Sequence, residues 1–335
     1  MKPRFCKYLI MISSTFQFLN VTEYLGKYGI ERRNCILVLM SKRKKVNHQI
    51  LELFNDEKFA EVIFLFDQKR IGIFRAEFLA KKKLKRLSFE NIIIGNLYNI
   101  WCEYLINLHE LNHKPVVVDD GTLTIVISYN RKKKITPKSR LLNRDFIFSQ
   151  FFLRTKKKYK GPYKFFTIFD NLEFSINDTI ENNDLKQSKS TYSVPKNDSP
   201  EIWILGTPIV QKKMISELDY LSMIKRIEKF ANSNQLGIKY FKHRIENHYE
   251  FPICQFENSK PFEIFYLEST ITPKYIVSFY STTLFTMNKL GYSGKLMFIN
   301  ISDDKKKQGD WFNIELVYDV LNRSKEIKDF DEDFI

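Results

Sequence analysis

The sequence predicts an α/β protein with two Rossmann-like domains whose parallel sheets face across a cleft, and three observations support this fold class. Short apolar runs alternate with helical patterns of about 10–15 residues, which is typical of parallel strands joined by covering helices. The chain has 335 residues, of which 44% are apolar, enough to fill two cores of roughly 100–200 residues each. Residues 176–200 are rich in Asn, Asp, Ser and Lys and lack hydrophobic periodicity, so they are interpreted as a linker. We therefore expect one domain over 1–175 and another over 201–335.

Apolar runs and helical periodicity define the elements expected in the first domain. The expected strands cover 8–12, 35–40, 62–66, 92–94 and 115–118, and the expected helices cover 16–29, 48–58 and 97–111. Gly29 is expected to end the first helix, because glycine readily adopts the left-handed conformation that commonly follows a helix. Strands this apolar indicate a parallel sheet covered on both faces.

The same alternation resumes after the linker. Strands are expected at 202–205, 238–241, 262–266, 275–279 and 296–301, and helices at 214–232, 281–290 and 310–324. Gly291 is expected to close the second of these helices. Ligands of such folds bind outside the carboxyl ends of the strands, so we expect the functional residues in the loops that follow the strands.

Cysteine usage and hydropathy exclude several classes of protein. Cys6, Cys35, Cys102 and Cys254 are scattered and form no CxxC pair, which argues against a disulfide scaffold or a zinc site and indicates a reducing cytoplasm. No apolar stretch approaches the roughly 20 residues of a membrane-spanning helix. The N-terminus resembles a signal peptide, but its apolar run is short and no A-x-A cleavage pattern follows it. A first β-strand is therefore the favoured interpretation.

Positive charge dominates the chain and comes in blocks. Lys and Arg number 54 against 39 Asp and Glu, a formal net charge of +15. The basic blocks lie at 42–45, 81–86, 131–134, 156–160 and 305–307. Such blocks attract polyanions, and three interpretations stay open: solvated loops, contact with an anionic membrane surface, and nucleic acid. No RNP pattern, GXXG loop or Cys/His finger supports the nucleic-acid interpretation.

Two polar segments follow expected strands of the first domain. Ser14, Thr15 and Gln17 come after the first strand, where hydroxyls at a helix N-terminus either bind an anionic group or simply cap the helix. The pair Asp119-Asp120 follows the run 115–118 and precedes Gly121.

Adjacent carboxylates after a buried strand can yield a general base, since neighbouring negative charge raises a pKa. The alternative is an Asp-Gly hairpin turn into 123–129. The Gly-rich turn of a P-loop or a dinucleotide fingerprint is absent, and the chain has only 11 Gly.

Polar residues also follow strands of the second domain. Gly206 and Thr207 could approach a nucleotide closely or could form an ordinary turn. His243 follows a strand and suits a phosphate, although a lone histidine is more often structural. Ser281 and Thr282 open a helix, which makes them either a phosphate site or a helix cap.

The order of these segments resembles the bacterial sialyltransferases of glycosyltransferase family 52 and their polysialyltransferase relatives, which share a GT-B fold. Those families carry an acidic D/E-D/E-G motif, an HP motif and a Ser-Ser/Thr motif, which are matched here by Asp119-Asp120-Gly121, His243-Arg244 and Ser281-Thr282. The segments MISSTFQFL (11–19), LGTPIV (205–210) and ELDYL (217–221) are also similar to the family, and the resemblance covers 8–319. Arg244 replaces the proline that would stiffen the turn, and Thr282 replaces a second serine with another hydroxyl.

The resemblance implies an inverting, metal-independent transfer of sialic acid from CMP-sialic acid to a terminal sugar hydroxyl of lipooligosaccharide or capsule, with a first domain on the acceptor side and a second that binds the donor. It implies that Asp119 is the general base and that His243 stabilises the departing phosphate. The supporting residues are Asp120 and Gly121, the donor-binding residues are Gly206, Thr207, Glu263, Ser281 and Thr282, and the sugar or acceptor contacts are Ser14, Thr15 and Gln17. No metal or other cofactor is implied, and the DxD-like run 331–333 is interpreted as solvated charge.

Two other functions stay open. One is a relative that transfers a neutral hexose from a UDP-sugar. The other is a non-catalytic basic module that binds anionic glycan or nucleic acid, for which Arg244 is the best argument. The leading hypothesis expects a nucleotide sugar and a glycan acceptor as partners and no nucleic acid, and it leaves open an anionic membrane surface and a homodimer. The expected location is the cytoplasm, including the inner face of the inner membrane.

Overall fold

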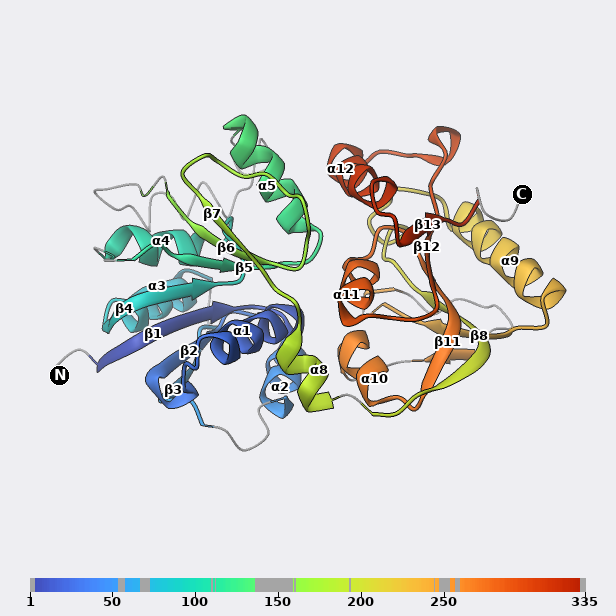
Figure 1. Ribbon diagram of the computed structural model, residues 1–335. Helices are drawn as coiled ribbons and strands as arrows, with labels where there is room; N and C mark the ends of the chain where they lie inside the picture. The colour runs from blue at the N-terminus through green and yellow to red at the C-terminus, as the bar shows by residue number, and fades with distance from the viewer. Residues whose placement is uncertain are drawn as a thin grey trace. The chain divides into compact units, whose positions relative to one another are not determined.

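A computed structural model of the chain describes residues 4–53, 58–66, 73–109, 111, 113–135, 159, 161–192, 194–243, 245–246, 254–256 and 260–331. The chain divides into two compact units, Met1–Gln187 (unit 1) and Ser188–Ile335 (unit 2). Each unit is built on a parallel sheet with helices packed on its faces (Figure 1).

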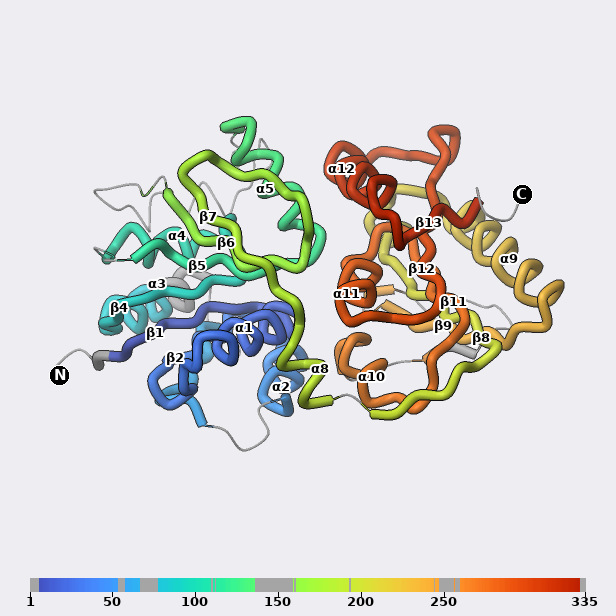
Figure 2. The backbone as a smooth tube through the Cα atoms, in the orientation of Figure 1, coloured from blue at the N-terminus to red at the C-terminus, as the bar shows by residue number. Residues whose placement is uncertain are grey.

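The boundary between the units differs from the expected one, because residues 176–200 carry regular structure. They contain the strand β7 (Thr179–Asn182), the helix α8 (Lys186–Tyr192) and the start of the strand β8 (Asn197–Leu205). The backbone runs from β7 into α8 (Figure 2), and the chain passes from unit 1 to unit 2 inside that helix. β7 is an edge strand with mostly exposed side chains. Its sequence therefore lacks the apolar pattern that marks a buried strand.

Within its described residues, unit 1 contains a seven-stranded parallel sheet in the order β3-β2-β1-β4-β5-β6-β7. The strands before β7 are β1 (Arg4–Ile12), β2 (Cys35–Leu39), β3 (Glu61–Phe64), β4 (Leu87–Ile94), β5 (Val116–Val118) and β6 (Lys164–Thr167). The helices are α1 (Thr15–Lys27), α2 (Lys44–Glu52), α3 (Ile73–Leu84), α4 (Ile100–Leu108) and α5 (Leu123–Lys133), with a 3₁₀ turn at Arg32–Asn34. The strand order reverses between β1 and β4, the kind of switch point at which Rossmann-like sheets bind ligands.

Several elements of unit 1 differ from the sequence-based expectation. The residues after Gly121 form α5, so the alternative interpretation of Asp120-Gly121 as a hairpin turn is wrong. The next strand, β6, is parallel to β5, and parallel strands need a crossover connection. The helix expected at 48–58 begins at Lys44 and ends at Glu52. α3 was not expected, since its lysine-rich last turn obscures the apolar pattern of the helix. β6 was also not expected.

Unit 2 contains, within its described residues, a six-stranded parallel sheet in the order β10-β9-β8-β11-β12-β13. The strands after β8 are β9 (Gly237–Phe241), β10 (Cys254–Phe256), β11 (Ile271–Ser278), β12 (Lys295–Phe298) and β13 (Ile327–Asp329). The helices are α9 (Glu217–Ser233), α10 (Phe262–Glu268), α11 (Thr282–Leu290) and α12 (Trp311–Asn322), with a 3₁₀ turn at Asp303–Lys305. Numbered within the unit, the order is 3-2-1-4-5-6, the dinucleotide-fold order, and its switch point lies between β8 and β11.

The helix α10 replaces the strand that was expected at 262–266. Pro261 precedes this helix and Glu263 lies in its first turn, where an acidic side chain is favoured by the helix dipole. Ile264, Tyr266 and Leu267 are buried. A short aromatic run of this kind cannot be assigned to strand or helix from its periodicity alone.

The central strands of both units are apolar and buried, which fixes the loops at their carboxyl ends. β2 is buried along its whole length, and so are Ile202–Leu205 of β8. Each fully buried aliphatic side chain contributes about 1.5–3 kcal/mol to stability. Cys6, Cys35 and Cys102 are free thiols buried within unit 1. None of the described helices combines the length and the hydrophobicity needed to cross a membrane.

Candidate active site

Asp119 is the first residue after β5, and its carboxylate is buried within unit 1. Its side chain is 1% exposed. Oδ2 accepts a 2.7 Å hydrogen bond from the backbone N–H of Ile168, which follows the neighbouring strand β6. Oδ1 has no hydrogen-bond donor among the described residues, although the hydroxyls of Thr124 and Thr167 lie near the carboxylate. A buried carboxylate oxygen without a donor is costly, and such atoms are typical of functional sites.

Burial sets the protonation of Asp119. Desolvation raises the pKa of its carboxyl to about 7, and the negative charge of Asp120 adds to the rise. The N–H of Ile168 and the hydroxyls of Thr167 and Thr124 oppose it. A carboxyl with a pKa near 7 is suited to take a proton from a substrate hydroxyl as a general base.

Asp120 is held by two side-chain amides. Oδ1 accepts a hydrogen bond from Nε2 of Gln17, and Oδ2 accepts one of 2.7 Å from Nδ2 of Asn96. Its backbone N–H donates to Oγ1 of Thr124 at 3.1 Å. Gln17 belongs to α1 and Asn96 follows β4, so the acidic turn is tied to the loops after both strands of the switch point.

Gln17, which is expected to contact the sugar or the acceptor, is 0% exposed and orders the turn after β1. Its Oε1 accepts hydrogen bonds from the backbone N–H (2.7 Å) and the hydroxyl (3.2 Å) of Ser13. Ser14 caps α1 by accepting the N–H of Gln17 at 3.2 Å, and Thr15 begins the helix. A Cβ on Gly95 would lie 2.3 Å from Cδ of Gln17. Residue 95 must therefore be glycine for this glutamine to fit.

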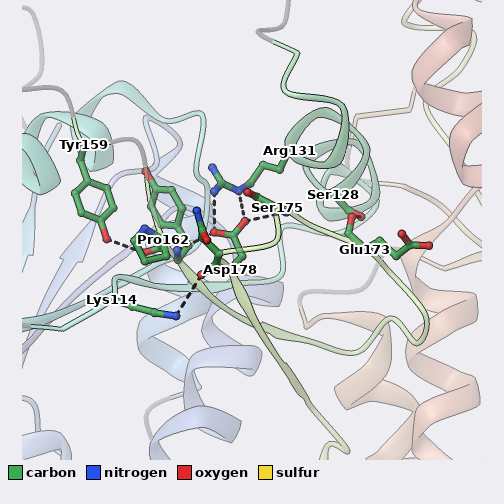
Figure 3. Close-up of polar contacts among 10 residues, drawn as sticks. Lys114, Ser128, Arg131, Tyr159, Pro162, Glu173, Ser175 and Asp178 are labelled. Atoms are coloured by element: carbon green, nitrogen blue, oxygen red, sulfur yellow. Dashed lines mark hydrogen bonds and ion pairs between the residues drawn. The ribbon is translucent and has the colours of Figure 1, made fainter.

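The segment 168–178 contacts the acidic turn at one end and the last turn of α5 at the other. Beyond the hydrogen bond from Ile168 to Asp119, Ser128 of α5 donates to the carbonyl of Glu173 at 2.7 Å. Arg131 forms two hydrogen bonds with Asp178, of 2.5 and 2.7 Å (Figure 3). The side chain of Asp178 is fully buried. Because α5 directly follows the acidic turn, these contacts fix the direction in which the turn leaves β5.

The N-terminus of α11 follows β11 in unit 2. Ser281 caps this helix by accepting the N–H of Thr283 at 3.2 Å. Thr282 is the first helical residue and is partly exposed. Gly291 ends the helix with a φ of +79°, as the sequence predicts. A helix N-terminus presents N–H groups and a partial positive charge, which favour a phosphate.

Glu263 lies buried beside this helix N-terminus. It is 5% exposed, and Oε1 accepts a 3.1 Å hydrogen bond from the hydroxyl of Thr283. Desolvation raises the pKa of its carboxyl, and the hydroxyl of Thr283 opposes the rise. The structure thus brings two of the predicted donor-binding features, Glu263 and the Ser281 helix cap, into one cluster.

Gly206 and Thr207 follow β8, next to β11. Oγ1 of Thr207 lies 3.5 Å from Oγ of Ser278, which in turn donates to the carbonyl of Leu205 at 2.9 Å. The Cα of Gly206 faces a protein side chain, because a Cβ there would lie 2.0 Å from Oε2 of Glu246. The glycine therefore makes room for Glu246.

His243 follows β9, and its turn is closed by Glu246, which was not among the predicted site residues. The N–H of His243 donates to Oε2 of Glu246 at 2.7 Å, and the N–H of Glu246 donates back to the carbonyl of His243 at 2.9 Å. Nδ1 of the imidazole accepts the N–H of Ile245 at 3.3 Å. Because Nδ1 accepts this hydrogen bond, we assign the proton of the neutral imidazole to Nε2. Arg244 lies outside the described residues.

The predicted site residues therefore form three groups. Asp119, Asp120 and Gln17 belong to unit 1. Unit 2 holds two clusters, one in which Glu246 links His243 to the Gly206 turn and one in which Thr283 links Glu263 to Ser281. Among the described residues, no group of three His, Cys, Asp or Glu side chains is arranged to hold a metal ion.

Comparison with protein-family models and with curated protein sequences gives no match. Solved structures do match. One is an α/β-galactoside α-2,3-sialyltransferase from the luminous marine bacterium Photobacterium phosphoreum, with a TM-score of 0.52 and 13% identity over 99% of this chain and 100% of that chain. Another is a glycosyltransferase of kitacinnamycin, with a TM-score of 0.50 and 9% identity over 99% of this chain and 88% of that chain. The fold is GT-B. The predicted fold class is confirmed, and at these identities the likeness concerns the fold.

Proposed function

We propose that this GT-B protein is an inverting, metal-independent sialyltransferase. It moves sialic acid from CMP-sialic acid to a terminal sugar hydroxyl of a surface glycan such as lipooligosaccharide or capsule. The fold shared with a bacterial sialyltransferase and the order of the three sequence motifs support this function. The observation that carries it is Asp119, a buried carboxyl with a pKa near 7 and one oxygen without a donor among the described residues.

Asp119 supplies the base in this proposal. Oδ1 takes the proton of the acceptor hydroxyl while the hydroxyl oxygen attacks the anomeric carbon of the sugar and the bond to the CMP phosphate oxygen breaks. Asp119 begins the acidic turn, and its side chain is almost fully buried. Gly121, whose φ is +67°, gives this turn a conformation that other residues adopt with strain. Asp120, held by Gln17 and Asn96, keeps the turn anchored.

Unit 2 binds the donor in this proposal. The N–H groups at the start of α11 bind the phosphate, and Nε2–H of His243 donates to it as negative charge develops on the departing CMP. Glu263 accepts hydrogen bonds from the ribose hydroxyls. The contact between Thr283 and Glu263 supports this placement, because it joins the ribose carboxylate to the phosphate-binding helix.

The nucleotide is tested by thermal unfolding with CMP, UDP and a short oligonucleotide in turn. Stabilisation by CMP alone is expected, since a ligand that binds only the native state raises its stability. Stabilisation by UDP alone would replace the donor with a UDP-hexose, and a response only to the oligonucleotide would refute an enzyme of either kind. Transfer from CMP-sialic acid to a lactose-type acceptor then tests the reaction directly.

The exposed basic residues support peripheral contact with an anionic membrane. The side chains of 42–45 are exposed, as are Lys82, Lys83, Lys85 and Arg86. The block 131–134 is partly neutralised, because Arg131 pairs with Asp178. Sedimentation with liposomes at low salt should show binding to anionic vesicles that weakens as salt rises. Equal binding to neutral and anionic vesicles would refute this contact.

A further inference from the structure

Glu246 is the centre of a buried hydrogen-bond network in unit 2. The side chain is 6% exposed. Oε1 accepts hydrogen bonds from the hydroxyls of Tyr220 (2.8 Å) and Tyr240 (2.9 Å), which lie 2.7 Å from each other. Oε2 accepts the backbone N–H of His243 at 2.7 Å. The partners come from α9, from β9 and from the loop after β9.

The same network reaches the turn after β8. The N–H of Thr207 donates to the hydroxyl of Tyr220 at 3.4 Å. A Cβ at position 206 would lie 2.0 Å from Oε2 of Glu246 and 2.6 Å from the hydroxyl of Tyr240. Glu246 therefore contacts two loops that both leave the carboxyl edge of the sheet, one after β8 and one after β9.

Burying a carboxylate in a protein core costs desolvation free energy. Desolvation raises the pKa of Glu246, against the hydrogen bonds from His243, Tyr220 and Tyr240. Apolar side chains of similar volume often give equal or greater stability than buried ionic groups. What an apolar side chain cannot do is accept the N–H of His243 and the two tyrosine hydroxyls at once. The carboxylate therefore fixes geometry in a way that simple packing would not.

We propose that Glu246 is a positioning residue of the donor site, acting through His243 and the Gly206–Thr207 turn. The inference rests on the proposed function, because it takes His243 as the group that stabilises the departing phosphate. Glu246 holds the backbone of His243 at both ends, through Oε2 and through its own N–H. The imidazole is held within the same turn by the N–H of Ile245. Loss of the carboxylate displaces the ring, and a displacement of about 1 Å at a reacting group can cost up to about 10²-fold in rate.

Two substitutions separate the hydrogen bonding of Glu246 from its charge. In Glu246→Gln, the amide oxygen can accept the N–H of His243 while the amide N–H groups donate to the tyrosine hydroxyls. We expect kcat for sialyl transfer within about 5-fold of wild type. In Glu246→Ala we expect kcat to fall by about 10–100-fold, with KM for the donor changed by less than about 5-fold. Equal loss in both variants, or a loss confined to KM, would contradict positioning.

A double mutant and a milder variant complete the kinetic test. Glu246→Ala in a His243→Ala background should cost less than the product of the two single losses, because Glu246 acts in part through the ring. Fully multiplicative losses would overturn the proposal. Tyr240→Phe removes one donor to Glu246 without a cavity, so it should lower kcat in the same direction by a few-fold. It keeps the test open if Glu246→Ala fails to fold.

Hydrogen exchange gives a readout that needs no activity. The amides of His243 and Thr207 should exchange at least about 10-fold faster in Glu246→Ala than in wild type. Glu201→Ala is the matched control: it removes a partly buried carboxylate bonded to Lys239 (2.8 Å) and Trp203 (2.6 Å) in the same sheet, and should leave both amides unchanged. Unchanged amides in Glu246→Ala would overturn the proposal whatever the activity. Faster amides in a protein that transfers no sugar and binds no nucleotide would overturn the proposed function instead.

Discussion

Asp119 of unit 1 and Glu246 of unit 2 are both carboxylates buried after a parallel strand, but their hydrogen bonding is opposite. Desolvation raises the pKa of each. Asp119 has a donor on one oxygen and none among the described residues on the other, whereas both oxygens of Glu246 accept hydrogen bonds. Burial alone therefore does not make an acid reactive. An oxygen without a donor leaves room for a substrate proton, while a carboxylate with donors on both oxygens holds backbone in place.

The largest expected effect is that of Asp119→Asn on turnover. The amide keeps the shape of the side chain and removes its basicity, so initial rates with CMP-sialic acid and a lactose-type acceptor should fall by roughly 10²–10⁴-fold. CMP affinity should change little. Asp120→Asn is the matched control, because Asp120 is held by amides at both oxygens. If Asp120→Asn is inactive and Asp119→Asn is fully active, the roles of the two residues are reversed. If both variants are active, the acidic motif has only a structural role as a turn.

The raised pKa of Asp119 also predicts how stability depends on pH. The folded-state pKa of about 7 exceeds the ordinary value of 3.8, so the native state keeps a proton that the unfolded state releases as pH rises between these values. The free energy of unfolding therefore falls over that window, by at most about 4 kcal/mol. Asp119→Asn does not titrate and should lose this component. Urea unfolding at pH 5 and pH 8 measures it, and parallel pH dependence in the two proteins would refute it.

His243→Ala tests whether the imidazole of His243, which Glu246 positions, acts in the chemical step. Removing a donor to the developing phosphate charge should lower the rate of transfer by about 10²-fold. CMP affinity should weaken by less than about 10-fold. The comparison of single-turnover rates with calorimetric CMP binding decides the point. A loss confined to binding would make His243 a ground-state contact and would leave the Glu246 network without a catalytic purpose.

Glu263 is a third buried carboxylate to compare with Asp119 and Glu246, and its Oε1 accepts a hydrogen bond from Thr283. Glu263→Ala should weaken CMP binding by about 1–3 kcal/mol, the range for a lost hydrogen bond to a charged group. Calorimetry with CMP measures this change, and thermal unfolding confirms that the fold is retained. Unchanged CMP affinity would place the ribose elsewhere in unit 2.

Much of the fold follows from the sequence, because buried parallel strands carry a continuous apolar run. The run at 35–40 matches β2 to within one residue, and the run at 275–279 covers the second half of β11, which begins at Ile271. Elements whose pattern is weakened were not found. β7 is polar because it lies at an edge, the last turn of α3 is lysine-rich, and α10 is too short for its period to be measured.

The candidate site could be predicted only where its residues follow strands directly. Asp119 and Ser281 were found in this way, since strand order places such loops at one edge. Glu246 was not, because its partners Tyr220 and Tyr240 lie 26 and 6 residues away and meet only when α9 packs on the sheet. The role of Gln17 was also hidden, because its contact with Asp120 joins residues 103 positions apart.

The end of unit 1 has a consequence for the order of events during synthesis. The N–H of Gln187 donates to Oε2 of Glu23 at 2.9 Å, and the amide of Asn183 donates to Oδ1 of Asn20 at 2.8 Å. Both pairs join α1, made among the first residues, to a segment made about 160 residues later. Contacts of such long sequence separation form late. A nascent chain therefore cannot complete the packing of unit 1 until residue 187 has left the ribosome. Chaperones should bind the incompletely packed apolar surface of this unit during that interval.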